Sequence, residues 1–262
     1  MQSVGMAIPL STLYERLQWV YPLIFDEIVV RCKPPLHEIL SQYPKVVHAI
    51  SHAGSCGWIP PILALLRIAV QEGGQNRKAL GIFHRLFYQI KLTRWIMQNI
   101  FESKSPPNFA QVIEAFKNGP VNDVALFPEG DNCILGDVYE IRPFRSPKFI
   151  ELAVATGAPI LITVHRGAEE WGRDFYMPSA MLRWLRFIQP SYVRPLIKNP
   201  VINLPLRFTR IPKFSLHASL YFPRISYDQL SSRPRERWFQ LNEEAQRVKT
   251  VMVALLKDMP YV

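Results

Sequence analysis

The sequence has few cysteines, and none of them falls in a metal-binding or disulfide-framework pattern. Its 262 residues include only Cys32, Cys56 and Cys133, an odd number without a CxxC pair. We therefore expect neither a disulfide-stapled module nor a thiolate zinc site, and a reducing compartment is the simpler interpretation. Internal repeats and low-complexity tracts are also missing, so the sequence predicts no repeat array and no long linker.

Long hydrophobic runs and a secretory leader are absent as well. The longest apolar stretch, Trp58 to Val70, is interrupted by Arg67, and it is shorter than the ~18–20 residues that a membrane-spanning helix needs. The first residues lack a basic start followed by a continuous apolar segment. We therefore expect a cytoplasmic protein without a transmembrane helix.

Acidic residues are in deficit, because 21 Asp and Glu face 31 Lys and Arg, for a net charge of +10. Most of the excess lies in a segment with one acid, Asp174, and six aromatic residues. This mixture suits an anionic membrane surface, and it would also attract nucleic acid, although no nucleic-acid-binding motif accompanies it. We expect peripheral membrane association and no nucleic-acid partner. The basic residues of the segment are Arg173, Arg183, Arg186, Arg194, Lys198, Arg207, Arg210 and Lys213.

Hydrophobic residues make up 48% of the chain, which is enough for a packed core in one large domain. Short segments rich in β-branched residues predict strands, and helix-like segments lie between them. This alternation predicts an α/β fold with a mainly parallel, mixed sheet flanked by helices. The predicted strands are 45–50, 123–127 and 159–164, and the helices between them begin near Pro60 and Lys78 and span 108–117 and 147–156.

The two ends of the chain carry further elements. An apolar stripe from Ser11 to Arg31, with a break at Pro22, predicts an N-terminal helical appendage over residues 1–40, which leaves 41–262 as the α/β domain. A strand is expected over 216–222, and a long helix with an apolar stripe is expected from Pro234.

Two ionisable residues follow predicted strands and are the candidates for chemistry. His52 lies in the small-residue loop SHAGSCG after the first strand, and Glu129 lies in the sequence FPEG after the second. A histidine in such a loop is suited to general-base catalysis, because its pKa lies near neutrality. A lone histidine is nevertheless more often structural than catalytic. The catalytic interpretation of His52 therefore depends on the second motif.

The order and spacing of these motifs resemble the glycerolipid acyltransferase superfamily, whose members acylate glycerol phosphate and lysophosphatidic acid. That family has an H-x4-D loop after a strand and a later F-P-E-G-T-R-S segment, followed by an F-[KR] pair, a small-residue helix and an apolar strand. The counterparts here are His52, the FPEG of residues 127–130, Phe144-Arg145, the helix from Ile150 and Ala158-Pro159. The resemblance covers roughly residues 45–165.

The resemblance implies transfer of a fatty acyl group from acyl-CoA or an acyl carrier protein to a hydroxyl of a lysophospholipid or other glycerolipid. It implies His52 as the base and Glu129 as the residue that holds the acceptor. Gly130 and Asn132 occupy further motif positions, and Arg142 and Arg145 are nearby cations for an anionic group on the acceptor or the donor. No cofactor and no metal are expected.

This chain departs from the family pattern at two positions. Gly57 stands where the H-x4-D aspartate would be, and Asn132 stands where the FPEG-T-R arginine would be. Either another group orients the His52 ring, with a backbone carbonyl, Ser55 and Glu129 as candidates, or catalysis is lost. Family members that acylate neutral glycerides also lack the aspartate, so its loss weighs against a phosphate-bearing acceptor more than against acyl transfer.

Two alternatives to the acyltransferase stay open. One is a catalytically degenerate protein of the same fold that binds lipid. The other is an α/β-hydrolase with Ser55 as the nucleophile in A-x-S-x-G, but Pro60 and Pro61 interrupt the helix that should follow. Its partners would be Asp137 or Asp174 together with His217. A metal site at the carboxylates near Glu129 is not favoured, because the spacing matches no calcium loop.

Overall fold

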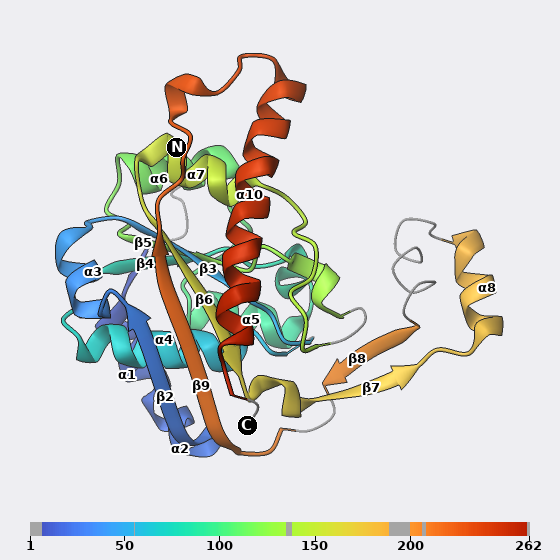
Figure 1. The fold of residues 1–262 in the computed structure, drawn as a ribbon. Helices are drawn as coiled ribbons and strands as arrows, with labels where there is room; N and C mark the ends of the chain where they lie inside the picture. Colours follow the sequence, from blue (N-terminus) through green and yellow to red (C-terminus); the bar gives the residue numbers. More distant parts are fainter. Residues whose placement is uncertain (1–6, 55, 135–137, 189–199, 206–207, 261–262) are drawn as a thin grey trace.

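Within the part of the chain that the structure describes, seven strands form one mixed sheet at the centre of the molecule (Figure 1). The computed structural model describes residues 7–54, 56–134, 138–188, 200–205 and 208–260. Across the sheet the strand order is β1-β4-β5-β3-β6-β9-β2, and β4, β5, β3 and β6 run parallel. The predicted α/β fold with a mainly parallel, mixed sheet is therefore confirmed. The strands are β1 (Ile8–Pro9), β2 (Phe25–Lys33), β3 (Val46–Ile50), β4 (Lys78–Gly81), β5 (Asp123–Leu126), β6 (Ile160–Arg166) and β9 (Ile211–Tyr221).

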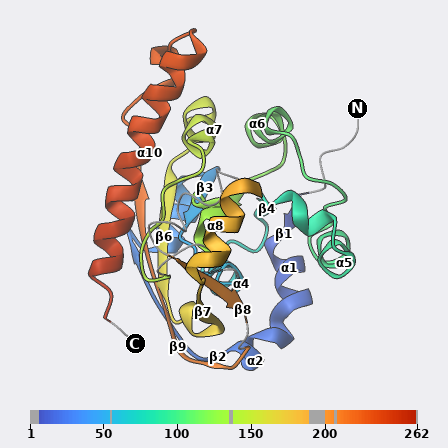
Figure 2. The same cartoon turned by 90° about the vertical axis from the view of Figure 1, so that its right-hand side faces the viewer.

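Helices cover both faces of this sheet, and each face has its own hydrophobic core (Figure 2). Successive side chains of a strand point to opposite faces, so Val46 and Ile50 join one core while Val47 and Ala49 join the other. One core contains α1 (Leu10–Leu17), α3 (Leu36–Gln42) and α4 (Ile59–Gln71); the other contains α6 (Phe109–Lys117), α7 (Lys148–Thr156) and α10 (Pro234–Lys257). The short helix α2 (Tyr21–Ile24) precedes β2, and α5 (Lys91–Asn99) follows β4.

Local sequence signals explain where several helices begin and end. Asn108 caps α6 through its side chain, which accepts a hydrogen bond from the backbone N–H of Gln111, and Gln111 returns the bond. Gly157 ends α7 with a φ of 67°, a conformation that suits glycine. The long helix predicted from Pro234 is confirmed, and its apolar stripe is buried against the sheet.

Two secondary-structure predictions were wrong. Residues Phe25–Lys33 form a strand where a continuation of the N-terminal helix was predicted, because the Ile28-Val29-Val30 run pairs along β9. Residues Lys78–Gly81 form a strand where a helix was predicted, since pairing with β5 and β1 outweighs the helix preference of lysine, alanine and leucine. The boundary predicted near residue 40 stays a prediction, and β1 and β2 are the two edges of the sheet.

An arm projects from the body of the molecule (Figure 1). It consists of β7 (Gly172–Tyr176), α8 (Ser179–Ile188) and β8 (Val201–Pro205), and β7 and β8 form a separate two-stranded antiparallel sheet. The arm lies within the basic segment identified in the sequence, of which Arg194, Lys198 and Arg207 fall outside the described residues. Among the residues that are described, no helix combines the length and the apolar character needed to cross a bilayer.

Candidate active site

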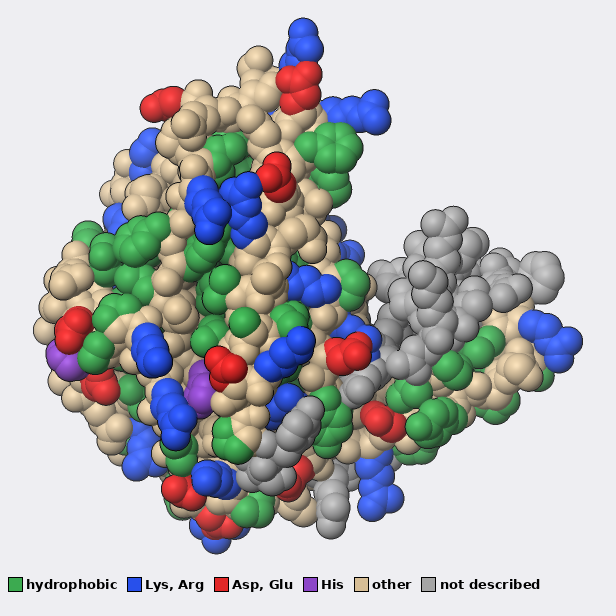
Figure 3. Space-filling view, in the orientation of Figure 1, with side chains coloured by type: hydrophobic (Ala, Val, Ile, Leu, Met, Phe, Trp, Pro, Cys, Tyr) green, Lys and Arg blue, Asp and Glu red, His purple; other side chains and the backbone are tan. Residues whose placement is uncertain are grey.

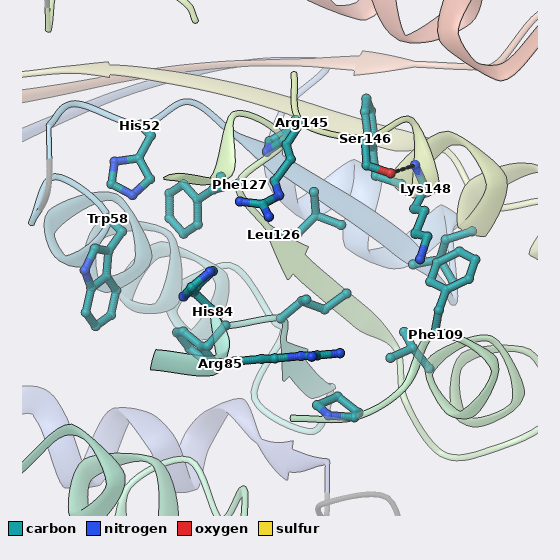
Figure 4. Close-up of a pocket in the computed structure, with 18 of the residues that line it drawn as sticks. His52, Trp58, His84, Arg85, Phe109, Leu126, Phe127, Arg145, Ser146 and Lys148 are labelled. Atoms are coloured by element: carbon teal, nitrogen blue, oxygen red, sulfur yellow. Dashed lines mark hydrogen bonds between the residues drawn. The ribbon is translucent and has the colours of Figure 1, made fainter. Parts of the chain in front are cut away.

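The carboxyl ends of three parallel strands meet at one edge of the sheet and surround a cavity. His52 follows β3, residues 82–85 follow β4, and Phe127, Pro128 and Gly130 follow β5. Together with α6 and α7 they line a cavity of about 860 Å³ (Figure 4). Ligands bind at this edge in open α/β sheets. His52 and the FPEG loop, which were both predicted to follow strand ends, lie at the same cavity.

His52 lies at one end of this cavity, between aromatic side chains. Its ring is 5.0 Å from that of Phe127 in an edge-to-face arrangement, and Trp58 lies beside it (Figure 4). Burial lowers the pKa of His52 to about 3, the neighbouring His165 adds to the shift, and the Gly54 backbone opposes it. The ring is therefore neutral at physiological pH. Its Nδ1 is buried and has no hydrogen-bond partner among the described residues, which leaves Nε2 as the nitrogen that can meet a ligand.

Glu129 connects two loops behind the cavity wall. Its Oε1 accepts a hydrogen bond of 2.9 Å from the backbone N–H of His52, and its Oε2 accepts one of 2.8 Å from the backbone N–H of Arg142. The side chain is fully buried and does not line the cavity. Burial raises the pKa of Glu129 to about 7, although these two hydrogen bonds and the charges of Arg142 and Lys249 act in the opposite direction. In this structure Glu129 therefore fixes the backbone at His52; its predicted contact with an acceptor stays a prediction.

The backbone around Gly57 leaves no room for a side chain. A Cβ atom at this position would overlap the carbonyl group of Ala53. The aspartate of the H-x4-D motif is thus absent from the sequence and also incompatible with this loop conformation. The loop would have to be rebuilt, not merely substituted, to bring a carboxylate to the His52 ring from residue 57.

His165 supports the same loop from β6, and the sequence analysis did not identify it. Its Nε2 lies 3.0 Å from the carbonyl oxygen of Ser51; because a carbonyl only accepts, Nε2 carries the proton. The ring stacks on Phe214 at 5.5 Å, and burial lowers the pKa of His165 to about 4. The residue before His52 is therefore held by His165, and His52 itself is held by Glu129.

Cationic side chains lie along the cavity away from His52, and no carboxylate lines it among the described residues. Figure 4 shows Arg85 and Arg145 between the His52 end and the far end, where Lys148 lies by Phe109. The Nζ atom of Lys148 is 5.2 Å from the Phe109 ring centre. We call Arg85, Arg145 and Lys148 the cationic rim. Only Arg145 of these three was a sequence candidate.

The remaining sequence candidates occupy different places. Gly130 lines the cavity with a φ of 57°, and a Cβ atom there would lie 3.2 Å from the Arg145 side chain. Asn132 and Arg142 do not line it: the Asn132 amide donates to the Pro143 carbonyl at 2.9 Å, and the Arg142 guanidinium lies 3.6 Å from the Glu140 carboxylate. The Asn132 amide therefore contacts the neighbouring loop in this structure, and its predicted role in substrate binding stays a prediction.

The rival sites are only partly described. Ser55 and Asp137 lie outside the described residues, so the hydrolase alternative stays a prediction; His217 is buried in β9, and Asp174 lies on β7 in the arm. No cluster of three or more histidine, cysteine, aspartate or glutamate residues that could hold a metal occurs within the described ranges.

Comparison with solved structures shows a similarity in backbone arrangement. No protein-family model and no curated protein sequence matches the chain. The crystal structure of the 1-acyl-sn-glycerophosphate (LPA) acyltransferase PlsC from Thermotoga maritima is similar, with a TM-score of 0.47 and 17% identity over 95% of this chain and 81% of that chain.

Proposed function

We propose that this protein transfers a fatty acyl group from an acyl thioester, acyl-CoA or acyl carrier protein, to a hydroxyl group of a glycerolipid. The observation that carries the proposal is the polarity of the cavity: a neutral imidazole at one end and apolar and aromatic walls, with cations and no carboxylates along the rest among the residues that the structure describes. Apolar walls suit an acyl chain, and the cationic rim suits phosphate groups on the donor or the acceptor.

In the proposed reaction His52 acts as the general base. Its Nε2 takes the proton of the acceptor hydroxyl while the hydroxyl oxygen attacks the thioester carbonyl carbon. The tetrahedral intermediate then collapses, the carbon–sulfur bond breaks, and the leaving thiolate receives the proton from His52. An imidazole with a lowered pKa is a weaker base, but it is fully deprotonated at the start of the cycle.

In this proposal Glu129 and His165 act on the position of His52 instead of on its ring. Glu129 holds the His52 backbone N–H, and His165 holds the Ser51 carbonyl. Both bonds hold the peptide unit that links Ser51 to His52. Fixing this unit limits where the imidazole can go, which is a substitute for the orientation that an aspartate gives in a catalytic triad. The further role predicted for Glu129, contact with the acceptor, is retained in the proposal.

The proposal includes attachment to an anionic membrane surface through the arm. Apolar and aromatic side chains are exposed along it, among them Tyr176 (77% exposed) and Trp184 (73%). Arg173 and Arg183 lie beside them, and Figure 3 shows hydrophobic and basic side chains along the arm. Exposed aromatic residues next to cations favour the headgroup region of a bilayer. A cytoplasmic location stays a prediction.

A second candidate, a lipid-binding protein of the same fold without catalysis, is favoured by Gly57. The loop has no space for a carboxylate there, and an unaided His52 ring could bind lipid without promoting proton transfer. This candidate predicts the same cavity and the same membrane attachment, but no turnover.

Thiol release from acyl-CoA separates the two candidates. Purified protein is mixed with acyl-CoA and either a lysophospholipid or a monoglyceride, and free thiol and acylated lipid are measured. The acyltransferase predicts equal amounts of both products and their loss in His52→Ala. His37→Ala is the matched control, because His37 is exposed and pairs with Glu72 away from the cavity. Lipid binding without thiol release in the wild type would support the non-catalytic candidate.

A further inference from the structure

The base of the arm touches the loop that carries His52, and the side chain of Asn203 takes part in this contact. Asn203 lies on β8 and is only 3% exposed, although the arm projects from the body. Its Nδ2 donates a hydrogen bond of 3.0 Å to Asp174, its cross-strand partner on β7. The carboxamide is therefore fixed to the arm's own two-stranded sheet.

The same carboxamide packs against two glycines that leave space for it. A Cβ atom at Gly172, on β7, would overlap the amide group of Asn203. A Cβ atom at Gly54, in the loop that carries His52, would overlap the amide oxygen of Asn203. Asn203 thus lies between the arm and the His52 loop in direct contact with both.

A displacement of the Gly54 backbone would also displace His52. Gly54 lies two residues after His52, it has a φ of 66°, and its backbone influences the pKa of the His52 ring. The strand β8 also contacts the segment Gly130–Ile134 that follows the FPEG sequence. Both loops of the candidate active site are therefore in contact with the strand that carries Asn203.

We infer that Asn203 is a positioning residue that couples the arm to the His52 loop. Docking of the arm on an anionic lipid surface then changes the position of the His52 ring in the cavity. The inference rests on the membrane role of the arm in the proposed function. The inference adds that the lipid surface changes the His52 end of the cavity in addition to anchoring the protein. The coupling passes through van der Waals contact of the carboxamide with Gly54, which a shorter side chain would remove.

The test measures His52 directly and does not depend on turnover. The rate at which diethyl pyrocarbonate modifies His52 is followed by peptide mass spectrometry, with and without vesicles of phosphatidylcholine containing phosphatidylglycerol. In the wild type we expect the anionic vesicles to lower this rate about fivefold or more, the lower range of typical couplings between sites. Vesicles of phosphatidylcholine alone should leave the rate unchanged.

The Asn203→Ala variant should still bind the anionic vesicles, but the change in the His52 rate should fall below about twofold. Ile202→Ala is the matched control, because residue 202 lies on the same strand with its side chain on the opposite face. Should Asn203→Ala not fold, Gly172→Ala replaces it, since the added methyl group displaces the carboxamide from the arm side.

Three results would overturn the inference: wild-type protein that does not bind the anionic vesicles, wild-type protein that binds them without a change at His52, and an Asn203→Ala variant that keeps the full change. The last result would mean that the membrane merely shields the cavity. Failure of acyl transfer is a separate outcome, because the modification of His52 is measured in the absence of acyl donor and acceptor.

Discussion

The two ends of the cavity differ in packing and charge. At the His52 end, the loops are tightly packed, Glu129 is fully buried, and burial shifts the pKa values of both residues. At the cationic rim, the side chains of Arg85, Arg145 and Lys148 are exposed. The difference shows how one cavity can separate chemistry from binding. Burial at the His52 end controls the proton affinity of the ionisable groups. The solvent-exposed cationic rim attracts an anion without depending on close packing.

The strongest test of the packed end is Gly57→Asp. This variant restores the motif aspartate, yet we expect a loss of roughly 3 kcal/mol or more in the free energy of unfolding and no gain in activity, because the side chain collides with the Ala53 carbonyl. Denaturant unfolding measures the loss. Gly157→Asp is the control: a Cβ there meets open space, so only about 1 kcal/mol is expected from its positive φ. A stable, more active Gly57→Asp would show that the loop has room.

A second test of the packed end uses the pH dependence of stability. The folded protein keeps the Glu129 proton up to about pH 7, whereas the unfolded chain releases it near pH 4.5, so stability falls as the pH rises through this window. Glu129→Gln removes that contribution, and the wild type should lose up to roughly 3 kcal/mol relative to the variant between pH 4.5 and 7. Unfolding free energies of both proteins across this range measure it. The contribution of His52 is common to both and cancels, so parallel curves would contradict the buried acid.

The pH profile of acyl transfer examines His52 itself. A histidine with an ordinary pKa would lose about 30-fold in activity between pH 7.5 and pH 5 through protonation. Because the pKa of His52 is lowered to about 3, its protonation should change kcat/KM by less than about twofold over that range. The measurement is made in the wild type and in Glu129→Gln, since a step near pH 7 that disappears in the variant belongs to Glu129. A tenfold decline per pH unit below 6.5 in both proteins would contradict the shift.

The smallest effects are expected at the cationic rim. Arg145→Ala and Lys148→Ala should each raise the KM for acyl-CoA about two- to fivefold, the range for exposed charges, and added salt should reduce the difference. The KM for an acyl thioester of N-acetylcysteamine, which carries no phosphate, should not change. Lys117→Ala, an exposed residue of α6 away from the cavity, is the control variant. Equal effects on both donors would mean that the rim does not recognise phosphate.

The sequence predicted the part of the site that follows strand ends. His52 and Glu129 were expected at one cavity because parallel strands end at the same edge, and a hydrogen bond of 2.9 Å joins the Glu129 carboxylate to the His52 backbone. The direction of that carboxylate, toward backbone N–H groups and away from the cavity, could not be predicted, because backbone groups carry no sequence pattern. The close packing at Gly57 is likewise a property of the loop conformation.

Each residue that the sequence analysis missed has its own physical reason. Arg85 follows a strand of only four residues whose composition favours a helix, so the loop after β4 was not recognised. His165 lies within a fully buried strand and looks like a core residue in the sequence. Asn203 gains its importance from two glycines at positions 54 and 172, and such a long-range fit leaves no local signal.

The pairing of β2 with β9 has a consequence for the order in which the chain folds during synthesis. Residues Phe25–Lys33 align with residues 211–219, which lie 186 positions later in the chain (211 − 25). During synthesis this early segment emerges long before its hydrogen-bonding partner exists, and its unpaired backbone and β-branched side chains stay available to other chains. The addition of β2 to the sheet is therefore a late event of folding, and slow translation between the two segments prolongs the period in which newly made molecules are most prone to aggregate.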